Sequence, residues 1–152
     1  MNAKYNKGVI KKTENQRKKH VKQMTRKEQW YLREQIKNLP NIRFTQHALN
    51  NNIDVTIEQI KNTIKEYNYI IEYNETTDTY GKINRRVLVR SSRVYKVNFH
   101  KIDGSVIKGN ANLCFVVSID TGYIVTTYYN FINDGHRTID MRRYDKTLKI
   151  IK

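Results

Sequence analysis

Ile42-Arg43-Phe44-Thr45-Gln46-His47-Ala48-Leu49 is the stretch at which the 152-residue chain changes character. Charged and amide side chains dominate the residues before it, whereas an amphipathic segment and a series of apolar runs follow it. Thr45 is placed to cap a short helical turn through His47, which the asparagines at 50–52 end. We therefore expect the packed domain to begin here, with His47 set among apolar neighbours.

Two capping-box patterns predict the longer helices. Thr56-Ile57-Glu58-Gln59 precedes apolar residues spaced three, four and three apart, which predicts an amphipathic helix beginning at residue 57. Thr25-Arg26-Lys27-Glu28 has the same pattern before a short apolar stripe, so we expect a second helix over residues 26–37. Pro40 ends that stripe, because proline cannot continue a helix.

The residues after 68 favour β-structure. Apolar and polar side chains alternate there, as on strands with one buried face, and Asp103-Gly104 and Asp120-Thr121-Gly122 are turn sequences. Because these turns are closely spaced, we predict an α+β fold with a basic helical N-terminal extension, two helices and then an antiparallel sheet of four to six strands. The expected strands are 69–73, 86–90, 94–99, 113–119 and 123–129, with a loop over 74–84 and a last strand or helix within 138–151.

The charge is uneven along the chain. The formal net charge is +15, and the first 37 residues hold 12 of the 29 Lys and Arg but 3 of the 14 Asp and Glu. We therefore divide the chain into a basic helical arm, residues 1–40, and an α+β domain, residues 41–152. Residues 1–24 have few aliphatic side chains, which is typical of a solvated arm that orders on a partner and equally of a disordered tail.

A charge this high fits a polyanionic partner, and nucleic acid is the first candidate. The eleven tyrosines either stack bases beside these cations or fill the sheet. The cations that we expect to contact nucleic acid are Lys11, Lys12, Arg17, Lys18, Lys19, Lys22, Arg26, Arg85 and Arg93.

Several classes of protein are excluded by what the sequence lacks. The lone cysteine, Cys114, lies in an apolar run and is expected to be a small buried hydrophobe. We expect no metal and no cofactor, because there is no acid or histidine cluster at ligand spacing and no glycine-rich phosphate loop. No apolar run approaches the length of a membrane span or signal peptide, so we expect a cytoplasmic protein of a bacterium or a phage-infected host.

The order of these elements resembles a superfamily of small bacterial RNase-type domains that includes barnase, EndoU, colicins and RelE. The likeness is carried by Phe44-Thr45-Gln46-His47-Ala48, by the helix, strand and loop after it, and by antiparallel strands ending in Thr126-Thr127-Tyr128-Tyr129. It spans residues 42–130. Asn50-Asn51-Asn52 stands where the relatives have an Arg-containing turn, so the chain resembles a diverged, phage-encoded member.

The resemblance implies RNA binding and metal-free endoribonuclease activity. In such relatives a histidine after the first strand, a basic residue on a middle strand and a Thr or Tyr on a late strand line one face of the sheet. Histidine suits acid or base catalysis, and arginine suits a phosphate clamp. The implied catalytic residues are His47 as acid or base, Arg86 or Arg90 as clamp, with Arg85 a third basic position, and Tyr128 or Thr126 as a positioning hydroxyl.

Other interpretations stay open. A non-catalytic module that docks its basic arm on RNA or a ribonucleoprotein, such as an anti-CRISPR protein blocking a host nuclease complex, has this size and charge. A structural protein of a ribosome or phage particle is supported by charge alone. His47 is alternatively a packing or capping residue. The loop Asp134–Thr138 either brings His136 and Arg137 to an active face or is a solvated connection.

Overall fold

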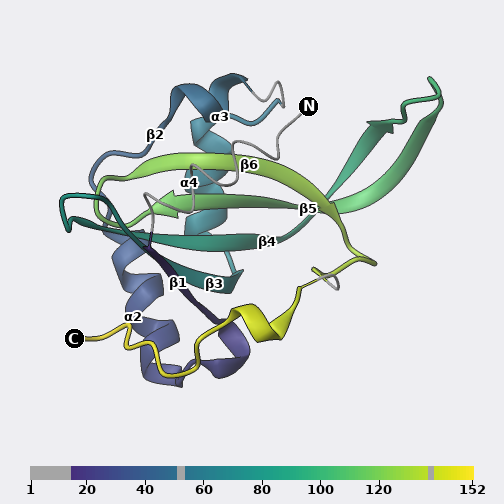
Figure 1. Cartoon of the computed structure of the whole chain (residues 1–152). Helices are drawn as coiled ribbons and strands as arrows, with labels where there is room; N and C mark the ends of the chain where they lie inside the picture. Colours follow the sequence, from purple (N-terminus) through teal and green to yellow (C-terminus); the bar gives the residue numbers. More distant parts are fainter. Residues whose placement is uncertain (1–14, 51–53, 137–138) are drawn as a thin grey trace.

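The computed structural model describes residues 15–50, 54–136 and 139–152, and it contains one curved sheet with helices packed against one face (Figure 1). The predicted α+β class is confirmed. The strands are β1 (Asn15–His20), β2 (Arg43–Phe44), β3 (Asn68–Thr77), β4 (Ile83–His100), β5 (Val106–Ser118) and β6 (Tyr123–Phe131), and the helices are α2 (Arg26–Lys37), α3 (Gln46–Asn50) and α4 (Ile57–Lys65), with 3-10 turns η1 (Val21–Gln23) and η2 (Met141–Arg143).

The six strands of the described sheet lie in the order β1-β3-β4-β5-β6-β2. Neighbouring strands are antiparallel except for β2, which runs parallel to the start of β6. The Thr45 amide donates to the Ile124 carbonyl at 3.0 Å, and the Thr45 hydroxyl caps α3 by accepting from the Ala48 amide at 3.1 Å. The stretch that opens the domain thus forms the outer edge of the sheet beside its last strand.

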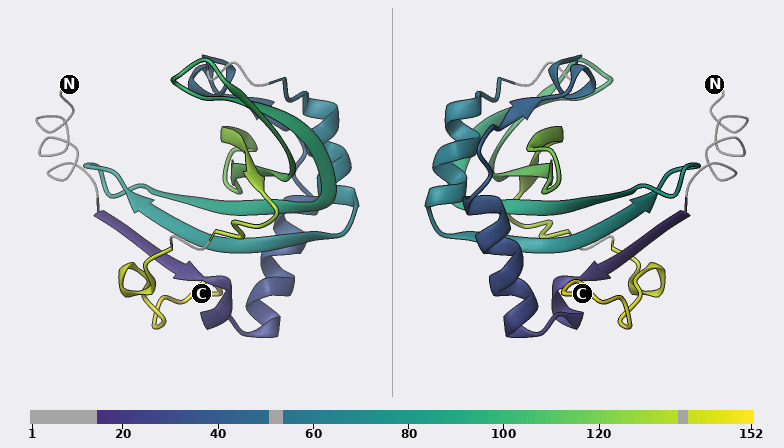
Figure 2. Two further views of the ribbon diagram at one scale, coloured as in Figure 1. Left: turned by 90° about the vertical axis from the view of Figure 1, so that its right-hand side faces the viewer. Right: turned by 90° about the vertical axis from the view of Figure 1, so that its left-hand side faces the viewer.

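Helices α2 and α4 begin where the capping boxes predict. Thr25 accepts from the Glu28 amide and Thr56 from the Gln59 amide, both at 3.1 Å, while the Glu28 and Gln59 side chains accept from the two threonine amides. The apolar residues of both helices pack on one face of the sheet, and no described α-helix covers the other face (Figure 2). The core contains Leu32 and Ile36 of α2, Ile60 and Ile64 of α4, and Tyr73, Val87, Val89, Phe115, Val117 and Ile124 of the sheet.

The structure differs from the prediction at residues 15–24. We expected a solvated arm there, but residues 15–20 form β1, which pairs with β3. Pairing satisfies the backbone amides that a polar helix would have satisfied internally, and the buried Lys19 ammonium binds Glu28 of α2 at 3.0 Å. Residues 15–40 therefore pack with the α+β domain. Residues 1–14, including Lys11 and Lys12, lie outside the described residues.

The second half of the chain also departs from the prediction in detail. β3 continues to Thr77, so the expected loop over 74–84 shrinks to a turn. The two predicted strands at 86–90 and 94–99 are one long strand, β4, with an irregularity between Arg90 and Val94. Asp103-Gly104 forms the predicted turn, with Gly104 in the left-handed region at φ 88°.

The last segment, residues 139–152, has only the 3-10 turn η2 in place of the expected strand or helix. It crosses the edge of the sheet at β1, where the Asp145 amide donates to the Lys18 carbonyl at 2.8 Å. Beyond that point Leu148 and Ile150 are buried in the core beneath the helices. Residues of this segment therefore reach both faces of the sheet.

Candidate functional site

The face of the sheet opposite α2 and α4, which we name the open face, carries most of the predicted catalytic positions. Strand pairing aligns side chains in rows, because paired residues point to the same side. One row contains Glu72, Leu88, Val116 and Thr126, and the next contains Arg90, Cys114 and Tyr128. Arg86 pairs with Asn74 in a further row. The positions Arg86, Arg90, Thr126 and Tyr128 therefore share one surface.

A pocket of about 520 Å³ opens on this face. Glu72 and Tyr128 come from the sheet, whereas His136 follows β6 and Tyr144 belongs to the final segment. The pocket thus combines an imidazole and two phenols with two carboxylates, those of Glu72 and Asp140, from parts of the chain that are distant in the sequence. Lys18 and Arg143 add two cations at its wall.

Arg90 forms the back of this cluster and is 7% exposed. Its guanidinium donates to Asn112 Oδ1 at 2.8 Å and Asn130 Oδ1 at 2.6 Å, and to the Phe131 carbonyl at 3.2 Å. Nη1, the nitrogen that donates to Asn130, also lies 2.9 Å from Nδ1 of His136. None of these acceptors carries a charge, so they orient the guanidinium without neutralising it.

The contact with Arg90 fixes the tautomer of His136. A guanidinium has no acceptor, so His136 Nδ1 must accept and the ring proton must lie on Nε2. Nε2 lies 2.9 Å from the Tyr128 hydroxyl and therefore donates to it. The Tyr128 hydrogen is then free for an acceptor in the pocket. Burial, and next the charge of Arg90, lower the pKa of His136, and burial raises the pKa of Tyr128.

His136 is held in an uncommon backbone conformation. Its φ of 61° follows a φ of 55° at Gly135, so two successive residues occupy the left-handed region. A non-glycine residue there costs free energy that the surrounding contacts must offset. The contacts to Arg90 and Tyr128 supply that compensation and aim the imidazole at the sheet.

Glu72 lies across the pocket and receives a hydrogen bond of 2.5 Å from the Tyr144 hydroxyl. No described residue donates to its other carboxylate oxygen. Burial and this hydrogen bond raise the pKa of Tyr144. The Tyr144 ring also packs edge-on against His20, with the ring centroids 5.2 Å apart, and burial lowers the pKa of His20. The final segment therefore builds one wall of the pocket.

Arg86 lines a second hollow on the open face, of about 210 Å³, together with Glu72 and Thr126. Its Nε atom is buried and has no hydrogen-bond partner in the described part of the chain. An unsatisfied buried donor is rare and costs free energy, so such an atom indicates a place where a ligand acceptor fits. Glu72 and Leu88 line both hollows, so the two hollows adjoin on the open face.

The other predicted residues lie elsewhere. His47 is exposed on α3 and lines neither hollow. Lys19 is buried and bound to Glu28, and Arg85 is bound to Asp120, so their charges are already used. Arg17 and Arg93 are exposed but pair with Asp145 and Glu66. Lys18 lies at the pocket, whereas Lys22 and Arg26 are exposed on η1 and α2.

Sequence reasoning missed Glu72 and Tyr144. Glu72 is the acid within the apolar run Tyr69-Ile70-Ile71-Glu72-Tyr73, and a carboxylate inside a strand is the signal that indicates a functional position. Tyr144 has no such signal, because its place depends on how the final segment folds back on β1. The sequence left open whether the loop Asp134–Thr138 brings His136 and Arg137 to an active face. In the structure the His136 ring lies against the sheet, at Tyr128. Arg137 lies outside the described residues.

No protein-family model, curated protein or solved structure was found to match the chain. Among the described residues no group of three or more His, Cys, Asp or Glu side chains is arranged to hold a metal ion. No described helix has the length and apolar character needed to cross a membrane. Cys114 is buried as predicted, and burial raises the pKa of its thiol to about 12.

Proposed function

We propose that the protein binds RNA and cleaves it without a metal ion, by attack of a ribose 2′-hydroxyl on the adjacent phosphate. The observation that carries the proposal is the pocket in which Glu72 faces a Tyr128 hydroxyl oriented by His136 and Arg90. Such a reaction needs a base for the 2′-hydroxyl, a cation for the phosphorane and an acid for the leaving oxygen. The resemblance to RNase-type domains supports the same reaction class.

Glu72 is the base. Its free carboxylate oxygen takes the 2′-hydroxyl proton, while the Tyr144 hydroxyl holds the other oxygen in place. The 2′ oxygen then bonds to phosphorus, and the bond from phosphorus to the 5′ oxygen breaks. The products are a 2′,3′-cyclic phosphate and a free 5′-hydroxyl, so Glu72 returns its proton to solvent at the end of the cycle.

Tyr128 is the acid for the leaving 5′ oxygen. Its hydroxyl hydrogen is free because His136 Nε2–H occupies the lone pair on the opposite side. A phenol with a raised pKa is still a stronger acid than the aliphatic alcohol whose leaving oxygen it protonates. The phenolate left behind is stabilised by the His136 donor and by the Arg90 charge behind it, and it recovers a proton from solvent.

Arg86 supplies the charge for the phosphorane. Its buried Nε has no partner among the described residues, and the Arg86 side chain lines the hollow next to Glu72, where a non-bridging phosphate oxygen would accept from the guanidinium. Arg90 adds a second positive charge that its neutral partners do not cancel. A guanidinium that is already held in place, as that of Arg90 is, stabilises developing negative charge without reorganisation.

The test is cleavage of a labelled RNA by purified protein in EDTA. We expect products that end in 2′,3′-cyclic phosphate and no cleavage of DNA of the same sequence, which lacks the attacking hydroxyl. Glu72→Gln should lower kcat by about 10²- to 10⁴-fold, because it removes general-base catalysis. Intact RNA at saturating protein concentration would refute the proposal.

Matched variants separate chemistry from folding. Glu58→Gln makes the same change on the exposed surface of α4 and should leave kcat unchanged. Tyr128→Phe keeps the ring and removes only the hydroxyl, so it should lower kcat with little change in KM, whereas Tyr80→Phe in the exposed turn between β3 and β4 should have no effect. Equal losses in Tyr128→Phe and Tyr80→Phe would remove Tyr128 from the mechanism.

A non-catalytic RNA-binding module is the second candidate, with the inhibitor of a host ribonucleoprotein nuclease as one form of it. One observation favours it, namely that Glu72 is already engaged by Tyr144. In that case the pocket recognises a phosphate or base and releases the RNA intact. Tight RNA binding without cleavage in the same assay, lost in Arg86→Gln, would support this candidate.

A further inference from the structure

We infer that the ribbon formed by residues 94–112 of β4 and β5 binds the phosphate backbone of an RNA strand that continues beyond the pocket. This inference rests on the proposed function and specifies its substrate as RNA long enough to span both surfaces. The ribbon projects from the body of the domain in Figure 1. β3 pairs with β4 no further than Ser91, and β6 pairs with β5 no further than Ala111, so both ribbon edges extend past the neighbouring strands.

The two faces of the ribbon differ in chemistry. One face carries Tyr95, Val97, Phe99 and Ile107, and Phe131 stacks on Phe99 with ring centroids 4.1 Å apart. The other face is mostly polar. Its members are Val94, Lys96, Asn98 and His100 from β4 and Val106, Lys108, Asn110 and Asn112 from β5.

The polar face is positively charged. Among residues 94–118 the sequence contains Lys96, Lys101 and Lys108 but only one acid, Asp103, which lies in the turn. Asp103 is engaged there by the Ser105 amide at 2.9 Å and by the Ser105 hydroxyl. Lys96 and Lys108 are exposed and border a hollow of about 580 Å³ together with Asn98 and Asn110. Cations and amides without a facing acid match a phosphate backbone.

The polar face is continuous with the pocket. Asn112 lies on the same side of β5 as Cys114, which pairs with Arg90 and Tyr128, and the Asn112 side chain accepts from Arg90. Lys108 and Cys114 are six residues apart on one strand, which corresponds to about 20 Å. A dinucleotide in the pocket cannot span that distance, whereas a stacked strand of about six nucleotides can, at roughly 3.4 Å per nucleotide.

The ribbon is held in place relative to the pocket. A Cβ atom at Gly109 would lie 2.2 Å from the Phe131 ring, so the glycine lets that ring sit directly against the strand. Phe131 also contributes the carbonyl that accepts from Arg90. The residue that stiffens the ribbon therefore also orients the guanidinium of the pocket, and a strand bound to one surface meets the other in a fixed register.

The test measures how removing charge from the ribbon changes the affinity of the full chain for a short and for a long RNA. Binding of fluorescent 2′-O-methyl RNA, which resists cleavage, is measured by anisotropy at several salt concentrations for a trinucleotide and a twelve-nucleotide strand. Lys96→Gln combined with Lys108→Gln should weaken twelve-nucleotide binding about tenfold or more and flatten its salt slope by roughly 1.4, since about 0.7 is lost per phosphate contact with single strands. Trinucleotide binding should not change.

The control is Lys61→Gln combined with Lys65→Gln, which removes the same charge from the exposed side of α4. Equal weakening by both pairs, or an unchanged twelve-nucleotide affinity and salt slope in the ribbon pair, would overturn the inference. If the ribbon pair lost binding to polyglutamate but kept its RNA binding, the inference would also be overturned, because the ribbon would then bind an acidic protein. Failure of the wild-type protein to cleave RNA would refute the proposed function and leave this binding result standing.

Discussion

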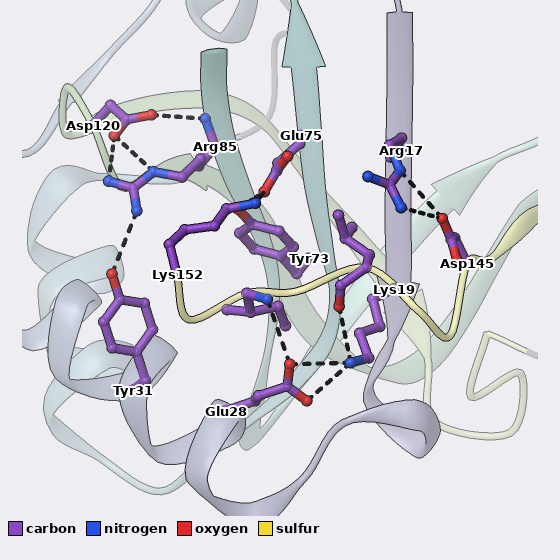
Figure 3. A network of polar contacts seen from close by, with 12 residues as sticks. Arg17, Lys19, Glu28, Tyr31, Tyr73, Glu75, Arg85, Asp120, Asp145 and Lys152 are labelled. Atoms are coloured by element: carbon purple, nitrogen blue, oxygen red, sulfur yellow. Dashed lines mark hydrogen bonds and ion pairs between the residues drawn. The ribbon is translucent and has the colours of Figure 1, made fainter.

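Arg85 and Arg86 are neighbours on β4, yet they meet opposite environments on the two faces of the sheet. On the helix-covered face Arg85 binds Asp120 at 2.6 Å and lies 3.4 Å from the Tyr31 hydroxyl (Figure 3). These partners raise the pKa of Arg85. On the open face Arg86 has a buried Nε without a partner in the described part of the chain. Identical side chains thus stabilise the fold on one face and remain available to a ligand on the other.

The pattern extends beyond these two residues. Figure 3 shows that the helix-covered side pairs each of its labelled cations with a carboxylate, as in Lys19 with Glu28 and Lys152 with Glu75. On the open face Arg90 is held by neutral amides and an imidazole. Burying an unpaired charge is costly, so its presence beside a pocket is better explained by ligand binding than by stability.

The largest expected effect comes from breaking the helix-side pairing. Glu28→Gln keeps the capping oxygen of α2 but leaves the buried Lys19 ammonium without its counter-charge. We expect a loss of about 3–5 kcal/mol in the free energy of unfolding, measured by urea denaturation. Adding Lys19→Met should restore much of that loss. A loss of unfolding free energy below about 1 kcal/mol would show that the Lys19–Glu28 pair does little to stabilise the helix-covered face.

The next effect compares the two arginines directly. Arg85→Gln removes charged hydrogen bonds to Asp120 and should cost about 2 kcal/mol of stability with little change in RNA affinity. Arg86→Gln should leave stability within about 0.5 kcal/mol and weaken RNA binding. Urea midpoints and RNA affinities of both variants test this difference between the two arginines. A larger stability loss in Arg86→Gln, or a larger loss of RNA affinity in Arg85→Gln, would contradict it.

The smallest effect is a pH dependence from the open face. His136 and His20 both have lowered pKa values, chiefly through burial. Below about pH 6.5 the unfolded chain binds more protons than the folded one, so stability should fall as the pH drops toward the folded pKa values, by at most about 1.4 kcal/mol per pH unit for each imidazole. Above pH 6.5 this stability is fully present.

Urea denaturation at pH 7.5, 6.5 and 5.5 measures the slope. His136→Gln should reduce the slope of the unfolding free energy against pH by the contribution of His136, because glutamine does not titrate. An undiminished slope in His136→Gln would assign the pH dependence to other groups and would weaken the argument that a neutral imidazole orients Tyr128.

Local signals in the sequence predicted local structure well. The capping boxes at Thr25 and Thr56 fixed the starts of α2 and α4, because a cap involves residues three apart. The resemblance implied one shared face for Arg86, Arg90 and Tyr128, and strand pairing places the three side chains on one face of the sheet.

Features that depend on distant pairing could not be predicted. β1 is a strand only because β3 offers an edge to it, and its own charged sequence does not favour β-structure. Glu72 and His136 line the same pocket because of the order of four strands, and Tyr144 binds Glu72 across 72 residues. His47 belongs to the clearest motif of the sequence, yet it lines neither hollow. A short motif predicts the local turn that it forms, but it does not predict which face of the sheet its side chains reach.

The final segment has a consequence for how the chain acquires its shape. Lys19 contacts Leu148, and Glu28 contacts Ile150, across 129 and 122 positions of the sequence. Contacts between such distant residues form slowly, because a long loop must close before they contribute stability. All six strands leave the ribosome before Tyr144, Leu148 and Ile150 do. The same final segment therefore closes the core and completes the pocket wall, so both steps wait for its synthesis.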